Sequence, residues 1–291
     1  MNPEAGHNGS GSEWSRTGIN PEADRVLRLA HKVLNRAPAI ANYRGPVQVG
    51  VDLGTAYTVL VVLDKNQQPL AGRYQFAQIV RDGLVVDFIG AIQLLKRMKA
   101  EVEADLGFGL EQAATTYPPG VSLAEVKATR NVLLGAGLEC SNFVDEPTGA
   151  NALLQVKDGA VVDIGGGTTG IAVVENGKVV YTADEPTGGT HFSLVVAGPL
   201  NVSFEEAERI KTDPAQSKRV SSMVYPVMQK VGSIVARHIA AFNVQTIYLV
   251  GGTSSLEGID EVISDMTGVK TVTPPHPMFV TPVGVAMIDG K

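Results

Sequence analysis

The stretch VGVDLGTAYTVLVVLD, residues 49–64, has a second copy in AVVDIGGGTTGIAVVE, residues 160–175. Without a gap, Asp52 aligns with Asp163, and the offset between the two copies is a constant 111 residues (163 minus 52). Each copy is an apolar run rich in valine, then a glycine turn, then a second apolar run, which predicts two buried strands joined as a hairpin. Because the pattern occurs twice, we expect two hairpins that face one ligand.

The turns of both copies carry groups that suit phosphate. Glycines leave backbone N–H groups accessible because no Cβ is in the way, and threonine hydroxyls add further donors. Asp52 and Asp163 would repel a polyphosphate on their own, so their presence implies a divalent cation, for which Mg²⁺ held through its water molecules is the natural candidate. The implied ligand is therefore an Mg-nucleotide. The alternative interpretation is that both aspartates only cap turns.

The pair DLGT (52–55) and DIGGGTT (163–169) resembles the two phosphate motifs of the actin, Hsp70 and sugar-kinase superfamily. Three further segments agree with that superfamily: TTYPPG (115–120), GLECSNFVDEPTGANALL (137–154) and LVGGTSSLEGID (249–260). All five segments lie in the superfamily's order, and the resemblance covers roughly residues 46 to 291. The resemblance implies an α/β protein with the actin-like ATPase (ribonuclease H-like) fold, in which two duplicated lobes enclose a nucleotide cleft that binds ATP or ADP with Mg²⁺.

The same resemblance predicts the domain organisation. Residues 46–156 with 278–291 would form lobe I, and residues 157–277 would form lobe II. Residues 1–45 are expected to be a flexible tail, rich in Gly, Ser and Asn at its start, with a short amphipathic helix that begins at Pro21 and ends before Pro38. That helix either docks on its own domain or, as a targeting peptide, binds the shell of a bacterial microcompartment.

Hydrophobic periodicity predicts the remaining elements of the chain. We expect helices at 87–106, 123–138, 204–211, 223–242 and 282–287, and strands at 113–117, near Phe143 and at 246–250. The strand near Phe143 would deliver Glu146, and the last helix would return the chain to lobe I.

The resemblance also assigns roles to individual residues. Asp52 and Asp163 would hold the water shell of Mg²⁺, and Glu146 would orient the attacking water, unless it forms a salt bridge or a helix cap before Pro147. The residues expected to bind the phosphates are Gly54, Thr55, Ala56, Tyr57, Gly165, Gly166, Gly167 and Thr168.

For the nucleoside, a second glycine turn would let adenine approach the backbone through Gly251, Gly252, Thr253 and Ser254. A helix would flank the ribose and base with Glu205, Glu208 and Lys211. The alternative for these three side chains is a solvated face of charges spaced three residues apart.

Other segments point to a branch of the superfamily. GGTHFS (188–193) and SFEEAERIK (203–211) are similar to bacterial actin-like proteins of cell shape and cell division. Residues 47–62, 80–91 and 273–290 resemble the EutJ family of ethanolamine utilization, chaperone-like proteins encoded among microcompartment functions. That resemblance implies protein clients, or enzymes of ethanolamine degradation, as partners.

Composition limits the alternatives. The 291 residues are 44% hydrophobic with a formal net charge of −6, which argues against nucleic acid as a primary partner. No window reaches the roughly 18 to 20 apolar residues of a membrane span, and the first residues lack a signal pattern. The single cysteine, Cys140, excludes an intramolecular disulfide and fits a reducing cytosol. We therefore expect a cytoplasmic location, with microcompartment association as an alternative.

Two departures from Hsp70 bear on activity. Gly170 stands where Hsp70 proteins have a second carboxylate after the glycine triplet, and no lysine corresponds to the one near their γ-phosphate. Each loss typically slows a reaction on the order of 10²- to 10³-fold. The protein is therefore either a slow ATPase or a pseudo-ATPase that binds nucleotide without useful hydrolysis.

Three functions remain open on this sequence. The first is an ATP-dependent chaperone-like factor that assembles or reactivates ethanolamine-degrading enzymes by lobe closure. The second is a nucleotide-dependent actin-like filament or scaffold. The third is a small-metabolite kinase, for which no substrate base has motif support.

Overall fold

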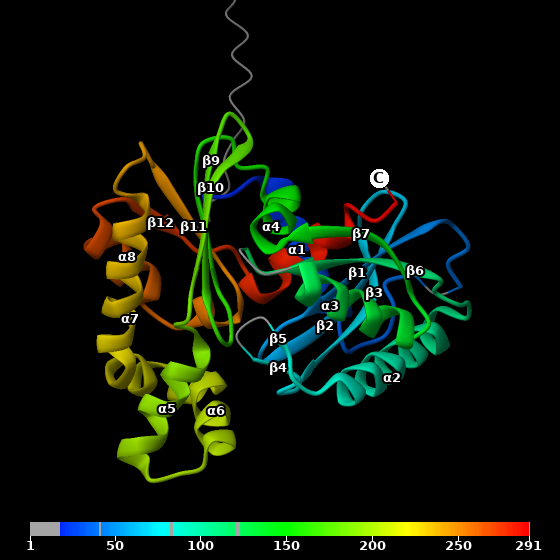
Figure 1. Cartoon of the computed structure of the whole chain (residues 1–291), viewed down its shortest axis with the longest axis horizontal. Helices are drawn as coiled ribbons and strands as arrows, with labels where there is room; N and C mark the ends of the chain where they lie inside the picture. The colour runs from blue at the N-terminus through cyan, green and yellow to red at the C-terminus, as the bar shows by residue number, and fades with distance from the viewer. Residues whose placement is uncertain (1–17, 41, 82–83, 120–122, 291) are drawn as a thin grey trace, which may run out of the picture.

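Two five-stranded sheets with the same strand order form the frame of the protein (Figure 1). The computed structural model describes residues 18–40, 42–81, 84–119 and 123–290, so the first 17 residues of the expected tail lie outside it. The first sheet has the order β3 (Pro69–Phe76), β2 (Tyr57–Asp64), β1 (Val47–Leu53), β6 (Gln112–Tyr117) and β7 (Glu139–Asp145). The second has the order β10 (Lys178–Glu185), β9 (Thr169–Glu175), β8 (Gly159–Ile164), β11 (Thr246–Val250) and β12 (Lys270–Val272).

The repeat in the sequence is a repeat in the structure. Antiparallel pairing joins β1 to β2 and β8 to β9, and the last pairs before the turns, Leu53 with Thr58 and Ile164 with Thr169, differ by the same 111 residues. The turns close alike: Gly54 N–H donates to the carbonyl of Tyr57 at 3.1 Å, and the turn at Gly165 has the matching bond at 3.0 Å. The predicted pair of hairpins is confirmed.

Helices cover each sheet, and each half has its own hydrophobic core. On the first sheet, α2 (Phe88–Leu106) and α3 (Leu123–Gly135) bury Leu95 and Leu133. Asp87 caps α2 by accepting from Gly90 N–H at 2.8 Å, and Gly107 ends it in a left-handed conformation. The second sheet is covered by α7 (Ser217–Ile239) and α8 (Ile259–Thr267), whereas α5 (Gly189–Leu200) and α6 (Phe204–Thr212) pack against each other beyond the end of the sheet, with α5 on α7 (Figure 1).

The helices α4 (Glu146–Leu154) and α9 (Val280–Ala286) pack against each other between the two sheets. They approach so closely that a Cβ added to Gly284 would clash with the backbone carbonyl of Gly149. Because α9 also packs on β1 and α4 packs on β8, this pair of helices connects the two halves. The predicted return of the chain to the first sheet near its end is confirmed by the contact of α9 with β1, whereas the exact lobe boundaries stay a prediction.

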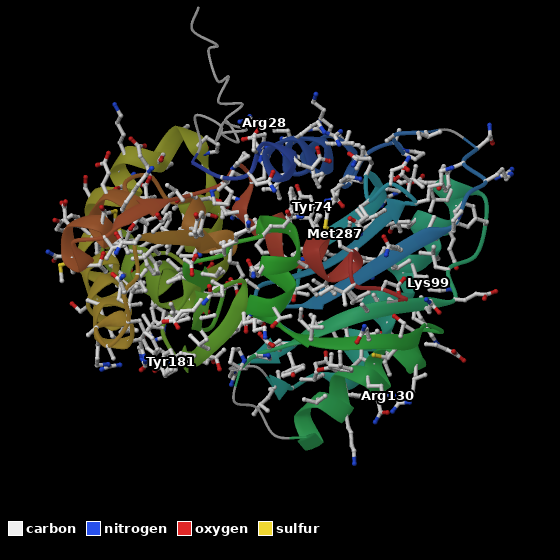
Figure 2. All side chains as sticks on the ribbon, turned by 90° about the horizontal axis from the view of Figure 1, so that it is seen from above. Arg28, Tyr74, Lys99, Arg130, Tyr181 and Met287 are labelled. Carbon is white, nitrogen blue, oxygen red and sulfur yellow. The ribbon has the colours of Figure 1, made fainter. Side chains whose placement is uncertain are left out.

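The helix α1 (Pro21–Val33) packs into a core cluster that joins the two halves. Asn20 caps it by accepting from Glu22 N–H, and its apolar face, which includes Leu27 with 0% exposure, is buried. The cluster contains Val61 from the first sheet and Tyr248 from the second. Seen from above, α1 lies beside Tyr74 of β3 (Figure 2). The structure thus shows the docked alternative, and a targeting role for this apolar face would require α1 to leave the core.

Most predicted elements are present, with some different bounds. The predicted helix at 123–138 ends at Gly135, and α7 begins at Ser217, earlier than predicted, with Pro226 inside it. The structure adds a short pair, β4 (Val80–Arg81) with β5 (Leu84–Val85), and the 3₁₀ turns η1 (Pro214–Gln216), η2 (Gly252–Ser255) and η3 (Pro277–Phe279). Among the helices that the structure describes, none is both long and apolar enough to cross a membrane.

Candidate functional site

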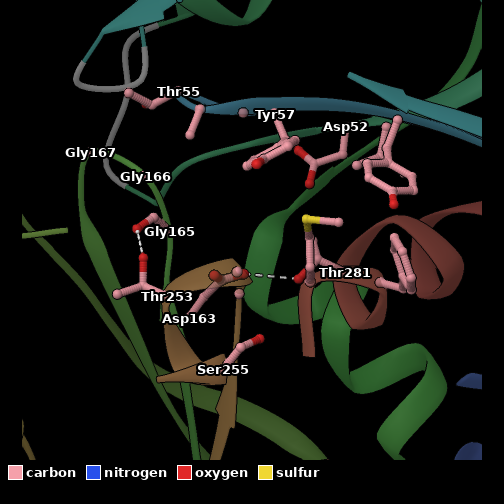
Figure 3. A pocket seen from close by; sticks show the side chains of 18 of the residues that line it. Asp52, Thr55, Tyr57, Asp163, Gly165, Gly166, Gly167, Thr253, Ser255 and Thr281 are labelled. Carbon is pink, nitrogen blue, oxygen red and sulfur yellow. Dashed lines mark hydrogen bonds between the residues drawn. The ribbon is translucent and has the colours of Figure 1, made fainter. Parts of the chain in front are cut away.

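A cavity of about 760 Å³ lies where the two hairpin turns meet (Figure 3). Most of the residues predicted for the nucleotide line it together. They are Asp52, Gly54, Thr55, Ala56, Tyr57, Glu146, Asp163, Gly165, Gly166, Gly167, Thr168, Glu208, Lys211, Gly251, Gly252 and Thr253. Segments that are far apart in the sequence therefore converge on one cavity, as the superfamily resemblance implies.

Three carboxylates enter the cavity from different elements. Asp52 lies near the end of β1 and Asp163 near the end of β8, and Glu146 is the first residue of α4. Two threonines hold the aspartates: Thr116 Oγ1 donates to Asp52 Oδ1 at 3.1 Å, and Thr281 Oγ1 donates to Asp163 Oδ2 at 2.9 Å. Figure 3 shows the bond between Asp163 and Thr281, which comes from α9. The aspartates are thus fixed by groups from the first sheet and from a connecting helix.

Glu146 is not the cap of its helix. The cap is Asp145, whose carboxylate accepts the N–H of Thr148 at 2.9 Å. Pro147 follows at the start of the helix, where a missing N–H does no harm. The cap alternative for Glu146 is therefore wrong, and its side chain is left to line the cavity.

The cavity holds these acids in an environment that disfavours their charge. Burial raises the pKa of Asp52 from 3.8 to about 7, with repulsion from Asp163 adding to it. Burial likewise raises the pKa of Asp163 to about 6, against the hydrogen bond from Thr281. Burial and then repulsion from Asp163 and Asp52 raise the pKa of Glu146 well above its ordinary value. All three acids ionise together only when a cation balances them.

This charge arrangement fits a divalent cation held through water. Within the described part of the chain, no three carboxylate, imidazole or thiol groups converge closely enough to bind a metal ion directly. Ionised carboxylates that line one cavity can instead accept hydrogen bonds from the water shell of an ion such as Mg²⁺, which gives up its water reluctantly. The donor set is therefore suited to a hydrated Mg²⁺ ion.

The two glycine turns touch across the cavity. A Cβ added to Gly166 would lie 2.6 Å from the Cβ of Ala56, and one added to Gly167 would lie 2.9 Å from Thr55 Oγ1. Both distances are shorter than the contacts that real Cβ atoms make, so the absence of side chains at these positions lets the turns approach. The spacing between the two halves at this point is set by glycine.

The nucleoside predictions divide into two groups. Lys211 Nζ donates to Glu208 Oε2 at 2.7 Å, and both side chains are buried in the cavity wall, where burial lowers the pKa of Lys211. The interpretation as a solvated face is therefore wrong for this pair. Glu205, one turn earlier on α6, is exposed and is not among the residues that line the cavity.

The third glycine turn packs against the second. Gly251 has a φ of 84°, and a Cβ there would clash with Asp163 Oδ1. Thr253 Oγ1 donates to the carbonyl of Gly165 at 2.8 Å (Figure 3). Ser254 is buried behind this turn, where its hydroxyl donates to the carbonyl of Val250 at 2.6 Å, so it holds the backbone and does not line the cavity. Its predicted contact with the nucleoside is not supported.

One wall of the cavity was not predicted. It consists of His31 from α1, Tyr74 from β3, and His276, Met278 and Phe279 around η3. The rings of His31 and His276 stack with centroids 3.8 Å apart and planes 9° apart. The available signal was the run HPMF in a segment matched to the EutJ family, but the pairing with His31 depends on the docking of α1, which sequence reasoning left open.

Comparison with known proteins shows which families this chain is similar to. Residues 72–205 match the MreB/Mbl protein family, and residues 160–284 match the family of the cell division protein FtsA. The protein is 41% identical to the ethanolamine utilization protein EutJ of Escherichia coli (strain K12) over 261 residues, 89% of this chain and 91% of that protein.

Solved structures agree. The crystal structure of EutJ from Carboxydothermus hydrogenoformans has a TM-score of 0.87 and 46% identity, and covers 91% of this chain and 98% of that one. MreB5 of Spiroplasma citri bound to ADP has a TM-score of 0.64 at 18% identity over 81% of this chain and 94% of that one, a likeness of fold alone. The duplicated hairpins, the cavity between them and this identity lead to one conclusion: the chain belongs to the EutJ family of ethanolamine utilization proteins and has the actin-like ATPase fold.

Proposed function

We propose that this protein is a nucleotide-driven switch of ethanolamine utilization, which acts in the cytoplasm as a chaperone-like factor for ethanolamine-degrading enzymes. It would close its two halves around Mg-ATP and use the two conformations to assist assembly or reactivation of those enzymes. The single observation that carries the proposal is the cavity in which two facing glycine turns meet three carboxylates with raised pKa values.

The described residues have distinct tasks in this proposal. The backbone N–H groups of the two glycine turns bind the phosphate oxygens. Asp52 and Asp163 accept hydrogen bonds from the water shell of the cation, and Glu146 accepts a hydrogen bond from the water that attacks the terminal phosphate. When bound, Mg²⁺ neutralises the phosphates and the carboxylates together. Because the cavity already brings these groups together, binding requires little rearrangement of side chains.

The adenosine part is assigned to the wall on the second half. Gly251, Gly252 and Thr253 form the turn that a base can approach, and the buried pair of Glu208 and Lys211 lies beside it. A lone buried ion pair is weak evidence for stability, because removing two charges from water offsets much of their attraction. A pair that lines a cavity is better explained by polar contact with a ligand, here the ribose hydroxyls. The ADP bound to the actin-like MreB5 supports the choice of an adenine nucleotide.

Calorimetry with a charge variant tests the proposal. Mg-ATP and Mg-ADP are titrated into the wild type, into Asp163→Ala and into Glu175→Ala, whose side chain is exposed at the end of β9. We expect binding to one site in the wild type and in Glu175→Ala, and a loss of at least tenfold in Asp163→Ala. Absence of binding in the folded wild type would refute the nucleotide switch.

Further assays on the same samples test turnover and the client. Phosphate release is expected to be slow in the wild type and absent in Glu146→Gln, which retains binding. Added with Mg-ATP to an inactivated ethanolamine-degrading enzyme, the wild type should restore activity and Asp163→Ala should not. Pelleting of the protein with ATP, without any effect on the enzyme, would favour a filament or scaffold instead.

A further inference from the structure

The strand β10 brings a fourth carboxylate to the cavity's acids. Gly170 on β9 occupies the position where the Hsp70 resemblance expects a carboxylate, and its antiparallel partner on β10 is Asp184. A Cβ added to Gly170 would lie 3.8 Å from Asp184 Oδ1, 3.9 Å from Glu146 Oε2 and 3.9 Å from the Cβ of Asp163. Asp184 therefore directs its carboxylate to the space that a longer side chain at position 170 would occupy.

Two observations indicate that this placement serves a ligand of the cavity. Asp184 repels the ionised forms of Asp163 and Glu146, and it contributes to the raised pKa of both. Asp184 thus adds a like charge beside Asp163 and Glu146, and a cation bound next to these two acids would offset that repulsion. The cavity beside them is lined by glycine turns suited to phosphate, which would add still more negative charge. A divalent cation would balance both the carboxylates and the phosphates.

We propose that Asp184 supplies, from the neighbouring strand, the carboxylate that Gly170 lacks, and that it acts as a positioning residue for the hydrated divalent cation through Asp163 and Glu146. This inference rests on the proposed nucleotide function. It changes the interpretation of Gly170: the site keeps the charge that position 170 lacks, because the cross-strand partner on β10 carries it. It names a residue for which the phosphate motifs give no signal.

Position 170 has room for a side chain, so the carboxylate can be moved from β10 back to β9 by substitution. The nearest atoms to a Cβ on Gly170 are at ordinary van der Waals distance, and the backbone there is not left-handed. The double variant Gly170→Asp with Asp184→Asn therefore restores a carboxylate at the same point from the other strand. Glu175→Gln, at the exposed end of β9, is the matched control for a change of charge on the same hairpin.

The experiment measures ADP affinity as a function of Mg²⁺ concentration, by calorimetry on the full chain. Loss of a group that orients metal ligands typically costs 10- to 100-fold in metal affinity. For Asp184→Asn we expect the Mg²⁺ concentration that gives half of the gain in ADP affinity to rise at least tenfold. ADP affinity in a chelator should stay equal or increase, since one negative charge is removed. The double variant should return to within about threefold of the wild type.

The outcomes separate this inference from the function on which it rests. Wild type that binds no ADP with Mg²⁺ would overturn both. Wild type with normal Mg²⁺ dependence, beside an unchanged Asp184→Asn, would overturn the role of Asp184 and leave the nucleotide function intact. Equal loss of ADP affinity with and without Mg²⁺, or a double variant that restores nothing, would make Asp184 merely structural. If Asp184→Asn does not fold, the double variant decides alone.

Discussion

Replacing Asp52 by Asn should stabilise the ligand-free protein, and by more at alkaline than at acid pH. Burial is the main reason that the pKa of Asp52 rises from 3.8 to about 7. A tenfold change in an acid constant corresponds to about 1.4 kcal/mol, so the ionised form opposes folding by at most about 4 kcal/mol. Because Asp52 is only partly buried and faces a water-accessible cavity, we expect about half of that value.

The direction of the pH effect follows from proton linkage. A carboxyl group whose pKa is higher in the folded than in the unfolded state stabilises the fold by binding a proton. That contribution is complete below about pH 4 and is lost as the pH rises to about 7. The wild type therefore loses stability over this range, whereas Asp52→Asn has no such loss. The amide oxygen of Asn can still accept the hydrogen bond from Thr116.

Urea denaturation from pH 5 to pH 8 in a chelator measures this effect. The free energy of unfolding of Asp52→Asn minus that of the wild type should grow by about 1 to 2 kcal/mol across the range. Glu111→Gln, at an exposed position before β6, controls for a general loss of charge. A difference that does not change with pH, or an Asn variant that is less stable at pH 8, would refute the reasoning, because the acid would then already be compensated in the ligand-free protein.

Three other substitutions test other parts of the fold. Gly166→Ala should weaken Mg-ADP binding about tenfold in calorimetry, because its Cβ would lie 2.6 Å from that of Ala56 and overpacking costs about 1 to 3 kcal/mol; Gly198→Ala, where no atom lies within 4 Å of an added Cβ, is the control. Leu27→Ala in α1 should lower the free energy of unfolding in urea by about 2 to 5 kcal/mol, and a loss below 1 kcal/mol would contradict the docking of α1. Lys211→Met should cost about 3 to 5 kcal/mol in the same assay by leaving the buried carboxylate of Glu208 without its positive partner, and adding Glu208→Gln should restore most of that loss.

The sequence predicts the parts of this fold that local patterns encode. The hairpins follow from valine runs and glycine turns, and the bounds of α2 follow from Asp87 and Gly107, which are ordinary signals for helix ends. The helix α5 was missed, because glycines mark its start and Pro199 lies inside it, and both signals favour a loop. Here the burial of Phe192 in the core of the second half outweighs local propensity.

The site residues that lie in the repeated turn motifs could be predicted from the sequence. Residues that reach the site through contacts between distant segments could not. The glycine turns and Asp52 with Asp163 could be placed because they recur in matching contexts. Glu205 and Ser254 were assigned by proximity to true lining residues, but Glu205 is exposed at the start of α6, and the hydroxyl of Ser254 turns to the carbonyl of Val250. His31 and Asp184 were missed for a different reason: helix docking brings one to the site and strand register brings the other, and neither is visible in a local pattern.

The same segments that connect the two halves also hold the acids of the cavity. The first residue of α4 is Glu146, and α9 carries Thr281, which donates to Asp163. These two helices pack tightly at Gly149 and Gly284, and α1 rests on α9. A change of charge at the carboxylates therefore acts directly on the helices between the sheets, with no need for a long path of coupled residues. For this reason we expect cation binding to change the angle between the two halves. We expect the packing of α1 to change first, because α1 packs on elements of both halves.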